Sequence, residues 1–270
     1  RFLSPISDSG DGALFMQLAR NKLGMTLNPM KPEGQEIVKK LVATADVVIA
    51  NLPPDTLQRM GLDYDSLAAI KADIILTTVS AFGRGGPYAN RVGFDGLGQA
   101  MSGAMYMSGT PEQPTKAYPP FIDFGTASLA AFGTMVALYE RQQTGKGQLI
   151  ELSMQEVMTM FMRTTGVTEW AKNPVGRRKH QAGAPGGIYP CAGGGENDYL
   201  FMLVVTTRMW DQLCIAIGRD DLLVDPRFQS ERLRRENRDV LDAEISAWTS
   251  QHDKHEAMRI LCESGVPASG

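Results

Sequence analysis

The stretch Ala45-Asp46-Val47-Val48-Ile49-Ala50-Asn51 decides the fold, because it is a continuous apolar run of strand-forming residues. Such a run predicts a strand that is buried on both faces of a parallel sheet. Two similar runs follow, Ile74-Ile75-Leu76-Thr77-Thr78-Val79-Ser80 and residues 149–153, with helical segments between them. Strands that alternate with helices indicate an α/β fold with a mainly parallel sheet.

Composition and charge exclude several classes of protein. The chain has 270 residues, of which 43% are hydrophobic, so it can form one large domain or two smaller ones. Its net charge of −3 argues against a nucleic-acid partner. Cys191, Cys214 and Cys262 lie far apart and form neither a disulfide framework nor a metal site, even with the three histidines, which suits the reducing cytoplasm. No apolar run approaches membrane-spanning length, so we expect no membrane partner.

Asp123 is the candidate catalytic residue. The run Pro119-Pro120-Phe121-Ile122-Asp123-Phe124-Gly125 brings one carboxylate to the start of a long helix rich in small residues. Aspartate is a favoured N-cap, and the helix dipole is expected to keep this carboxylate ionised. Asp123 is therefore either a cap alone or a cap that also acts as a nucleophile. The helix is apolar around most of its circumference, which predicts that it is buried.

The composition changes near residue 176. Residues 172–187 combine Asn-Pro, a basic run and several glycines, which is typical of a linker. We therefore predict a large α/β domain at 1–175, a linker or glycine loop at 176–187 and a smaller α+β domain at 188–270. The smaller domain is expected to contain a hairpin ending near 205 and helices near 207–217, 237–250 and 253–264.

Three local patterns give further expectations. Met25-Thr26-Leu27-Asn28 is expected to form a short strand, and residues 94–105 and 154–171 are each expected to form one helix. The glycines at 83, 85 and 86 follow a strand, but their spacing is not GxGxxG and Pro87 removes a backbone donor. We interpret this segment as a turn rather than a dinucleotide site.

Several short motifs together resemble the class III CoA-transferases, the group that includes formyl-CoA:oxalate CoA-transferase. They occur in the family's order and cover nearly the whole chain: Pro32-Glu33-Gly34, Ala45 through Asn51, Arg59-Met60-Gly61, Ser80-Ala81-Phe82-Gly83, Gly86-Pro87-Tyr88, Gln99-Ala100-Met101-Ser102-Gly103, Thr144-Gly145-Lys146-Gly147-Gln148, Asp225-Pro226-Arg227-Phe228 and Gly265-Val266-Pro267-Ala268. The resemblance implies a Rossmann-like large domain, a smaller second domain and two subunits interlocked as rings. Family members extend further at both ends, so we expect a preceding strand–helix unit and a C-terminal return to the large domain.

The resemblance also gives Asp123 a chemical role, because it falls on the family's nucleophilic aspartate. The implied reaction moves CoA from an acyl-CoA to a small carboxylic acid through an aspartyl anhydride and an aspartyl-CoA thioester. Water must be excluded from such an anhydride. No permanently bound cofactor and no metal are implied. The donor and acceptor acids stay open between a formyl-CoA/oxalate pair and a succinyl-CoA/dicarboxylate pair.

Contacts to CoA are carried over by position. They fall in four short segments and are Leu27, Asn28, Met30, Asn51, Leu52, Pro53, Arg59, Arg91, Val92, Gly93 and Phe94. Arg59 and Arg91 suit CoA phosphates, because guanidinium groups bind phosphate bidentately. Each is otherwise a solvated surface arginine. The family's glycine loop falls on Gln181-Ala182-Gly183, where an interdomain hinge is the alternative.

Two other functions compete with the transferase. A racemase of the same superfamily needs an acid and a base on opposite sides of the α-carbon, but Phe94 stands where a histidine would be required. Asp95, next to it, either caps its own helix or shapes the acceptor site. A non-catalytic CoA-binding module would keep the arginines without requiring Asp123.

Overall fold

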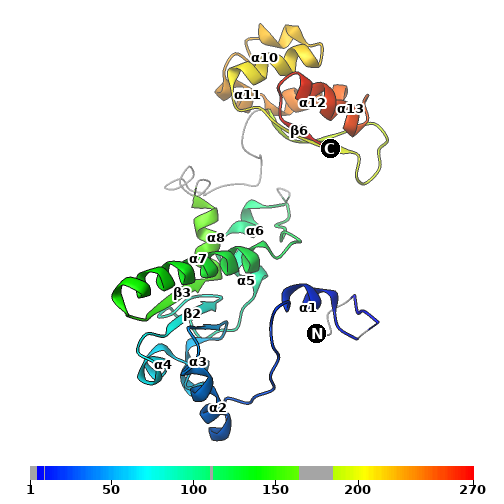
Figure 1. The fold of residues 1–270 in the computed structure, drawn as a ribbon. Helices are drawn as coiled ribbons and strands as arrows, with labels where there is room; N and C mark the ends of the chain where they lie inside the picture. Colours follow the sequence, from blue (N-terminus) through cyan, green and yellow to red (C-terminus); the bar gives the residue numbers. More distant parts are fainter. Residues whose placement is uncertain (1–4, 9, 110–111, 164–184) are drawn as a thin grey trace. The chain divides into compact units, whose positions relative to one another are not determined.

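The computed structural model describes residues 5–8, 10–109, 112–163 and 185–270 (Figure 1). The chain divides into two compact units, one of residues 1–105 with 116–170 and the other of residues 106–115 with 171–270. The boundaries predicted at 176–187 lie mostly outside the described residues.

The first unit contains a parallel three-stranded sheet in the order β1-β2-β3. Val47 pairs with Ile75 and Ile75 with Gln148, so the three strands run in one direction. Its elements in chain order are α1 (Ala13–Leu18), α2 (Pro32–Val42), β1 (Val47–Ala50), α3 (Pro54–Met60), α4 (Tyr64–Ile70), β2 (Ile75–Ser80), α5 (Asp95–Met101), the first half of α6 (Ala104–Met107), α7 (Phe121–Thr144), β3 (Gln148–Ser153) and α8 (Met154–Phe161). The predicted α/β fold with a parallel sheet is confirmed.

Helices cover both faces of this sheet. On one face, Val42 of α2 and Leu67 of α4 form a buried cluster with Leu76 of β2. Neighbouring residues of a strand point to opposite faces, so Thr77 faces the other side. There its hydroxyl lies 2.6 Å from the hydroxyl of Thr134 on α7. Helix α7 thus packs along β2 and β3, as Figure 1 shows.

The burial of α7 differs from the prediction. Only the face that carries Ile122, Thr126, Ala130, Thr134 and Ala137 is buried. The opposite face exposes large apolar side chains, namely Phe124, Phe132, Met135, Val136 and Tyr139. The helix is apolar on all sides, but the sheet covers one side only. By length and composition α7 could cross a membrane, so the prediction that no run approaches that length is wrong. Its inner face nevertheless packs as the core helix of an α/β sheet does.

Three local expectations are corrected. The segment Met25-Thr26-Leu27-Asn28 is mostly exposed and forms no strand, since no strand among the described residues pairs with it. The helix expected at 94–105 is interrupted after α5, where Gly103 adopts φ +86°. That left-handed conformation, which favours glycine, ends the helix. The helix expected at 154–171 ends at Phe161 as α8, and residues 164–171 lie outside the described part.

The second unit contains an antiparallel sheet in the order β4-β5-β6. Its elements are β4 (Gly186–Pro190), β5 (Tyr199–Leu203), α10 (Thr207–Ala216), the 3-10 helix η1 (Asp220–Leu223), α11 (Glu231–Glu236), α12 (Arg238–Thr249), α13 (Lys254–Glu263) and β6 (Ala268–Ser269). The predicted hairpin and the three predicted helices are confirmed.

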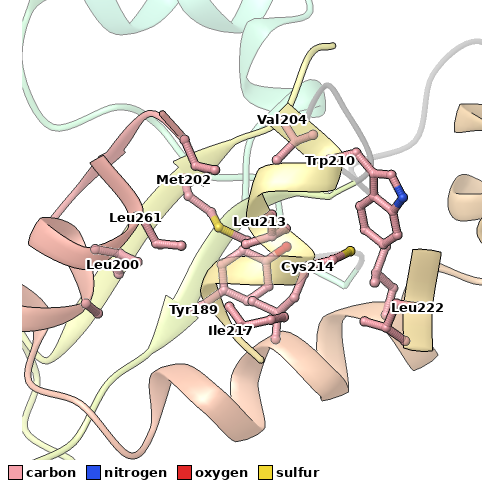
Figure 2. Close-up of a cluster of buried hydrophobic side chains, with 14 of the residues drawn as sticks. Tyr189, Leu200, Met202, Val204, Trp210, Leu213, Cys214, Ile217, Leu222 and Leu261 are labelled. Carbon is pink, nitrogen blue, oxygen red and sulfur yellow. The ribbon is translucent and has the colours of Figure 1, made fainter. Parts of the chain in front are cut away.

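One buried cluster holds this unit together, as Figure 2 shows. Leu200 and Met202 alternate with exposed neighbours along β5, and they meet Trp210 and Leu213 of α10. Trp210 is buried in this cluster, whereas Trp248 packs against it from a partly buried position. The apolar faces of strand and helix therefore build the core together.

Candidate active site

The carboxyl edge of the parallel sheet gathers the predicted site segments. Strands β1, β2 and β3 end at Ala50, Ser80 and Ser153, and parallel strands end at the same edge. Helix α7 begins at that edge because it packs back along the sheet before leading into β3. Ligands of open parallel sheets bind outside the carboxyl ends of the strands.

Asp123 lies in the first turn of α7, but it is not the cap that the sequence predicted. The helix begins at Phe121, and its N-cap is Pro120, which has no capping side chain. The capping oxygen comes instead from Asp95 of α5, whose Oδ2 accepts the backbone N–H of Ile122 at 2.8 Å and that of Asp123 at 3.3 Å. The prediction is wrong because Asp123 stands two residues inside the helix.

Asp95 is held by a small polar network. Its side chain is buried, and its Oδ1 accepts a 2.6 Å hydrogen bond from Nε2 of Gln99. The Oε1 of Gln99 accepts the backbone N–H of Ala117 at 3.1 Å, and Nζ of Lys116 lies 3.6 Å from Asp95 Oδ1. From the sequence, Asp95 was expected either to cap its own helix or to shape the acceptor site. Its hydrogen bonds to the first turn of α7 were not predicted. No local pattern marks a contact between residues 27 positions apart.

The surroundings of Asp123 disfavour its charge. Loss of hydration is the main cause that raises the pKa of the Asp123 carboxyl above its usual value, and the negative charge of Asp95 adds to it. A hydrogen bond from the backbone of Asp95 and the charge of the nearby Lys116 both lower the pKa, but they do not cancel the rise. The expectation that the helix dipole alone keeps Asp123 ionised is therefore incomplete, because it left out dehydration and a second carboxylate.

Gly93 and Phe94 stand beside this carboxylate pair in the chain. A Cβ atom at Gly93 would lie 2.4 Å from Cβ of Ala81, so only glycine allows the segment to pass the end of β2 so closely. Phe94 is the N-cap residue of α5 and exposes 69% of its surface. Val92 is also largely exposed. This arrangement places an exposed aromatic side chain next to the residue that caps α7.

A shallow depression near the start of α3 brings together some of the predicted CoA contacts. It is lined by Pro53, Asp55, Thr56, Gln58, Arg59 and Asn90. Asn90 accepts the backbone N–H of Asp55 at 3.1 Å, which ties the segment before Arg91 to α3. The guanidinium of Arg91 stacks 4.0 Å over the ring of Tyr88. Leu52 lines a separate small pocket at the ends of the strands, and Asn51, just before it in the chain, is exposed.

The earlier predicted contacts lie on an exposed connection to α2. Asn28 accepts the backbone N–H of Met30 at 3.0 Å, and Gln35 of α2 donates to the carbonyl of Arg59 at 3.2 Å. Asn28 and Met30 lie just before α2, and the hydrogen bond from Gln35 connects α2 to α3. Leu27 directly precedes Asn28. Gln181, Ala182 and Gly183 lie outside the described residues. Within the described ranges, no group of three His, Cys, Asp or Glu side chains is placed to hold a metal ion.

Comparisons with known proteins give one consistent result. The model of CoA-transferase family III matches residues 1–270. A succinyl-CoA–D-citramalate CoA-transferase from Chloroflexus aurantiacus is 34% identical over 93% of this chain and 63% of its own length. A formyl-CoA:oxalate CoA-transferase from Streptomyces coelicolor is 30% identical over 95% of this chain and 66% of its own. The chain therefore spans less than two thirds of the length of these curated relatives.

Solved structures agree with the sequence relatives. A crystal structure of a CAIB/BAIF family protein from Brucella suis superimposes with a TM-score of 0.76 at 32% identity, covering 92% of this chain and 66% of that chain. The Rv3272 protein of Mycobacterium tuberculosis gives a TM-score of 0.80 at 25% identity, with 92% and 66% coverage.

Replacing Asp123 by Asn is expected to stabilise the fold at neutral pH. An acid whose pKa rises on folding binds protons more tightly in the folded state, so its charged form destabilises the fold above that pKa. Thermal unfolding should give a higher Tm for Asp123→Asn than for the wild type at about pH 7. The difference should shrink as the pH falls through the pKa of Asp123.

Asp253→Asn is the matched control with the opposite sign. Backbone N–H groups of Glu256 and His255 hold the pKa of Asp253 below its usual value at the start of α13. Its charged form stabilises the fold, so this variant should lower Tm at neutral pH and converge on the wild type in acid. A Tm for Asp123→Asn below that of the wild type at neutral pH would contradict a raised pKa of Asp123 in the folded state.

Proposed function

The chain belongs to CoA-transferase family III, and from this premise we propose that it transfers CoA from an acyl-CoA thioester to a small carboxylic acid, with Asp123 as the nucleophile. The single observation that carries this proposal is the position of Asp123. It lies in the first turn of α7 at the carboxyl edge of a parallel sheet, exposed, and beside a second carboxylate that caps the same turn.

The proposed chemistry follows from a carboxylate in that position. The Asp123 carboxylate attacks the carbonyl carbon of the acyl-CoA, the carbon–sulfur bond breaks, and CoA leaves as thiolate with a mixed anhydride on Asp123. The thiolate attacks the aspartyl carbonyl, which releases the donor acid and leaves an aspartyl-CoA thioester. The acceptor carboxylate attacks that thioester, and the thiolate then attacks the acceptor carbonyl of the new anhydride, which regenerates Asp123.

The substrate classes are proposed from the names of the curated relatives. Curated relatives are named for succinyl-CoA with citramalate and for formyl-CoA with oxalate. We propose a small dicarboxylate as acceptor and leave the donor between formyl-CoA and succinyl-CoA. A racemase is disfavoured because Phe94 cannot transfer a proton. A CoA-binding module without catalysis would give no role to a partly dehydrated carboxylate at Asp123.

For CoA itself, we propose a path along the depression at α3. Arg59 is an exposed residue at the end of α3, and its Nη2 approaches only a neutral hydroxyl, Thr56 Oγ1, at 3.3 Å. Within the described part of the chain no carboxylate pairs with this guanidinium, so it suits a phosphate of CoA. Arg91, fixed over Tyr88, would add a second phosphate contact. The glycine loop at 181–183 is proposed to close over the acyl group.

We further propose that two copies associate, as interlocked rings by the family resemblance. The observation that favours association is the exposed outer face of α7, formed by Phe124, Phe132, Met135, Val136 and Tyr139. Contiguous exposed apolar surface of this kind marks interaction sites. A cytoplasmic location is proposed with it, since the chain carries three cysteines and the described ones are free thiols.

Asp123→Ala should abolish acyl exchange. The full-length variant is expected to lose at least about a thousandfold in the exchange of CoA between succinyl-CoA and a carboxylate acceptor panel. Hydroxylamine added during turnover of the wild type should leave a hydroxamate on Asp123, detected by peptide mass spectrometry. Asp253→Ala is the control that should retain exchange. Near wild-type exchange by Asp123→Ala would end the nucleophile proposal.

Arg59→Gln should weaken CoA binding without changing the fold. Loss of one charge-assisted phosphate contact is expected to raise the Kd for CoA about tenfold in calorimetric titration. Arg259→Gln removes a surface arginine of α13 that pairs with Glu263, and should leave the Kd unchanged. An unchanged Kd for Arg59→Gln would place the phosphates elsewhere.

Phe132→Glu should disrupt the proposed dimer. The side chain is 68% exposed in the single chain, so the charge is tolerated there but not in an apolar interface. Light scattering after size exclusion should show a dimer for the wild type and a monomer for the variant. Val224→Glu, at a 77% exposed site in the second unit, is the control that should stay dimeric. A wild-type monomer, or a dimeric Phe132→Glu variant, would refute the interface.

A further inference from the structure

We propose that Asp95 is the positioning residue of Asp123: it fixes the first turn of α7, and its negative charge favours the uncharged, acylated form of Asp123 over the free carboxylate. This inference rests on the proposed role of Asp123 as the nucleophile. It adds a second residue to that mechanism, one that acts through Asp123.

The geometry differs from that of an ordinary helix cap. Asp63 and Asp253 each cap the helix that directly follows them, through N–H groups two or three residues away. Asp95 instead reaches across from α5 to the N–H groups of Ile122 and Asp123, which are 27 and 28 residues away in the chain. Its side chain is 94% buried. A long-range buried carboxylate is costly unless its partners satisfy it, and here one of the partners is the nucleophile's own backbone.

The network around Asp95 leaves it one orientation. Oδ1 is occupied by Gln99 at 2.6 Å, and Oδ2 is occupied by the two N–H groups of α7. Gln99 is 2% exposed, and its other end accepts the backbone N–H of Ala117. The same two side chains therefore fix both the start of α7 and the segment that leads into it. A shift of Asp95 would move Asp123 relative to the edge of the sheet.

The charges around Asp123 come from few places. The charges of Asp95 on α5 and of Lys116 before α7 act on its carboxyl in opposite directions, and a hydrogen bond from the backbone of Asp95, which a change of the Asp95 side chain keeps, also lowers the pKa of Asp123. The other elements that pack against α7 contribute charges that are already engaged. Glu151 of β3 pairs with Arg84 at 2.8 Å, and Glu156 of α8 accepts from the hydroxyl of Ser153 at 2.7 Å. Strand β2 has no charged residue.

The electrostatic consequence follows from the charge balance of the first step. When Asp123 attacks the thioester, a carbon–oxygen bond forms, the carbon–sulfur bond breaks, and the negative charge passes from the carboxylate to the CoA sulfur. Asp123 becomes a neutral anhydride. Acylation thus removes the same charge that protonation removes. A fixed negative neighbour that opposes the carboxylate therefore favours the acylated state.

Asp95→Asn in the full chain tests the proposal. The amide oxygen can still accept from α7, so the cap is kept while the charge is lost. The acid limb of the pH profile of kcat/KM, measured with succinyl-CoA, should move to lower pH by about half a unit or more. The fraction of enzyme trapped by hydroxylamine as Asp123 hydroxamate should fall about threefold, because a pKa shift of about half a unit corresponds to about a threefold change in an equilibrium constant. Asp253→Asn, which removes a capping charge in the second unit, should change neither.

Lys116→Met keeps the test decisive if Asp95→Asn does not fold. Lys116 is 42% exposed, so its removal spares the core, and it should move the acid limb to higher pH. Opposite shifts for the two variants support the proposal, since a purely structural role would lower stability without reversing sign. If the wild type traps hydroxamate on Asp123 but both variants keep its acid limb, the role of Asp95 is refuted and the nucleophile stands. If the wild type traps none on Asp123, the proposed function itself fails.

Discussion

The buried carboxylate of Asp95 connects the elements on which the candidate site depends. Through one oxygen it binds the first turn of α7, and through the other it binds Gln99, which in turn holds the segment before that helix. Without this bond the start of α7 would have two unsatisfied N–H groups and no side-chain cap, since Pro120 provides none. The same contact brings a second negative charge beside Asp123. The stability of the helix start and the charge environment of Asp123 thus depend on one interaction.

The sheet gives this interaction its place. Three parallel strands end at one edge, and α7 packs its narrow buried face on β2 and β3 through Ala130, Thr134 and Ala137. The hydroxyls of Thr77 and Thr134 satisfy each other in that layer. Small side chains on this face let the helix approach the sheet closely; a Cβ at Gly133 would already lie 3.0 Å from Ile150. The close approach fixes where the first turn of α7 lies along the strands.

Much of the fold was predictable because it depends on patterns repeated along the chain. Continuous apolar runs predicted the parallel strands β1 and β2, and the glycine cluster at 193–195 before the run at 199–205 predicted the hairpin. The expected burial on both faces holds for most of β2 but is wrong for β1, where Ile49 is 69% exposed, because β1 is the edge strand of the described sheet. The prediction of a strand at Met25 to Asn28 was wrong, because a β-forming segment needs a partner strand, which the sequence of the segment does not specify. The prediction that α7 is buried on most sides was also wrong. The helix is apolar around its whole circumference, but only the side that faces the sheet is buried.

For the site, the sequence by itself determined that a lone aspartate opens a long helix after an extended apolar run, and that the motifs around it follow the order of a CoA-transferase family. The sequence also determined that position 94 is a phenylalanine, which cannot transfer a proton as a racemase would require. Only the tertiary structure decided that Asp123 lies within the first turn and that Asp95 is the cap. Helix capping by a residue 27 positions away depends on how two helices pack, and no local spacing encodes that. The raised pKa of Asp123 has the same origin, because dehydration and a neighbouring charge arise only when distant segments meet.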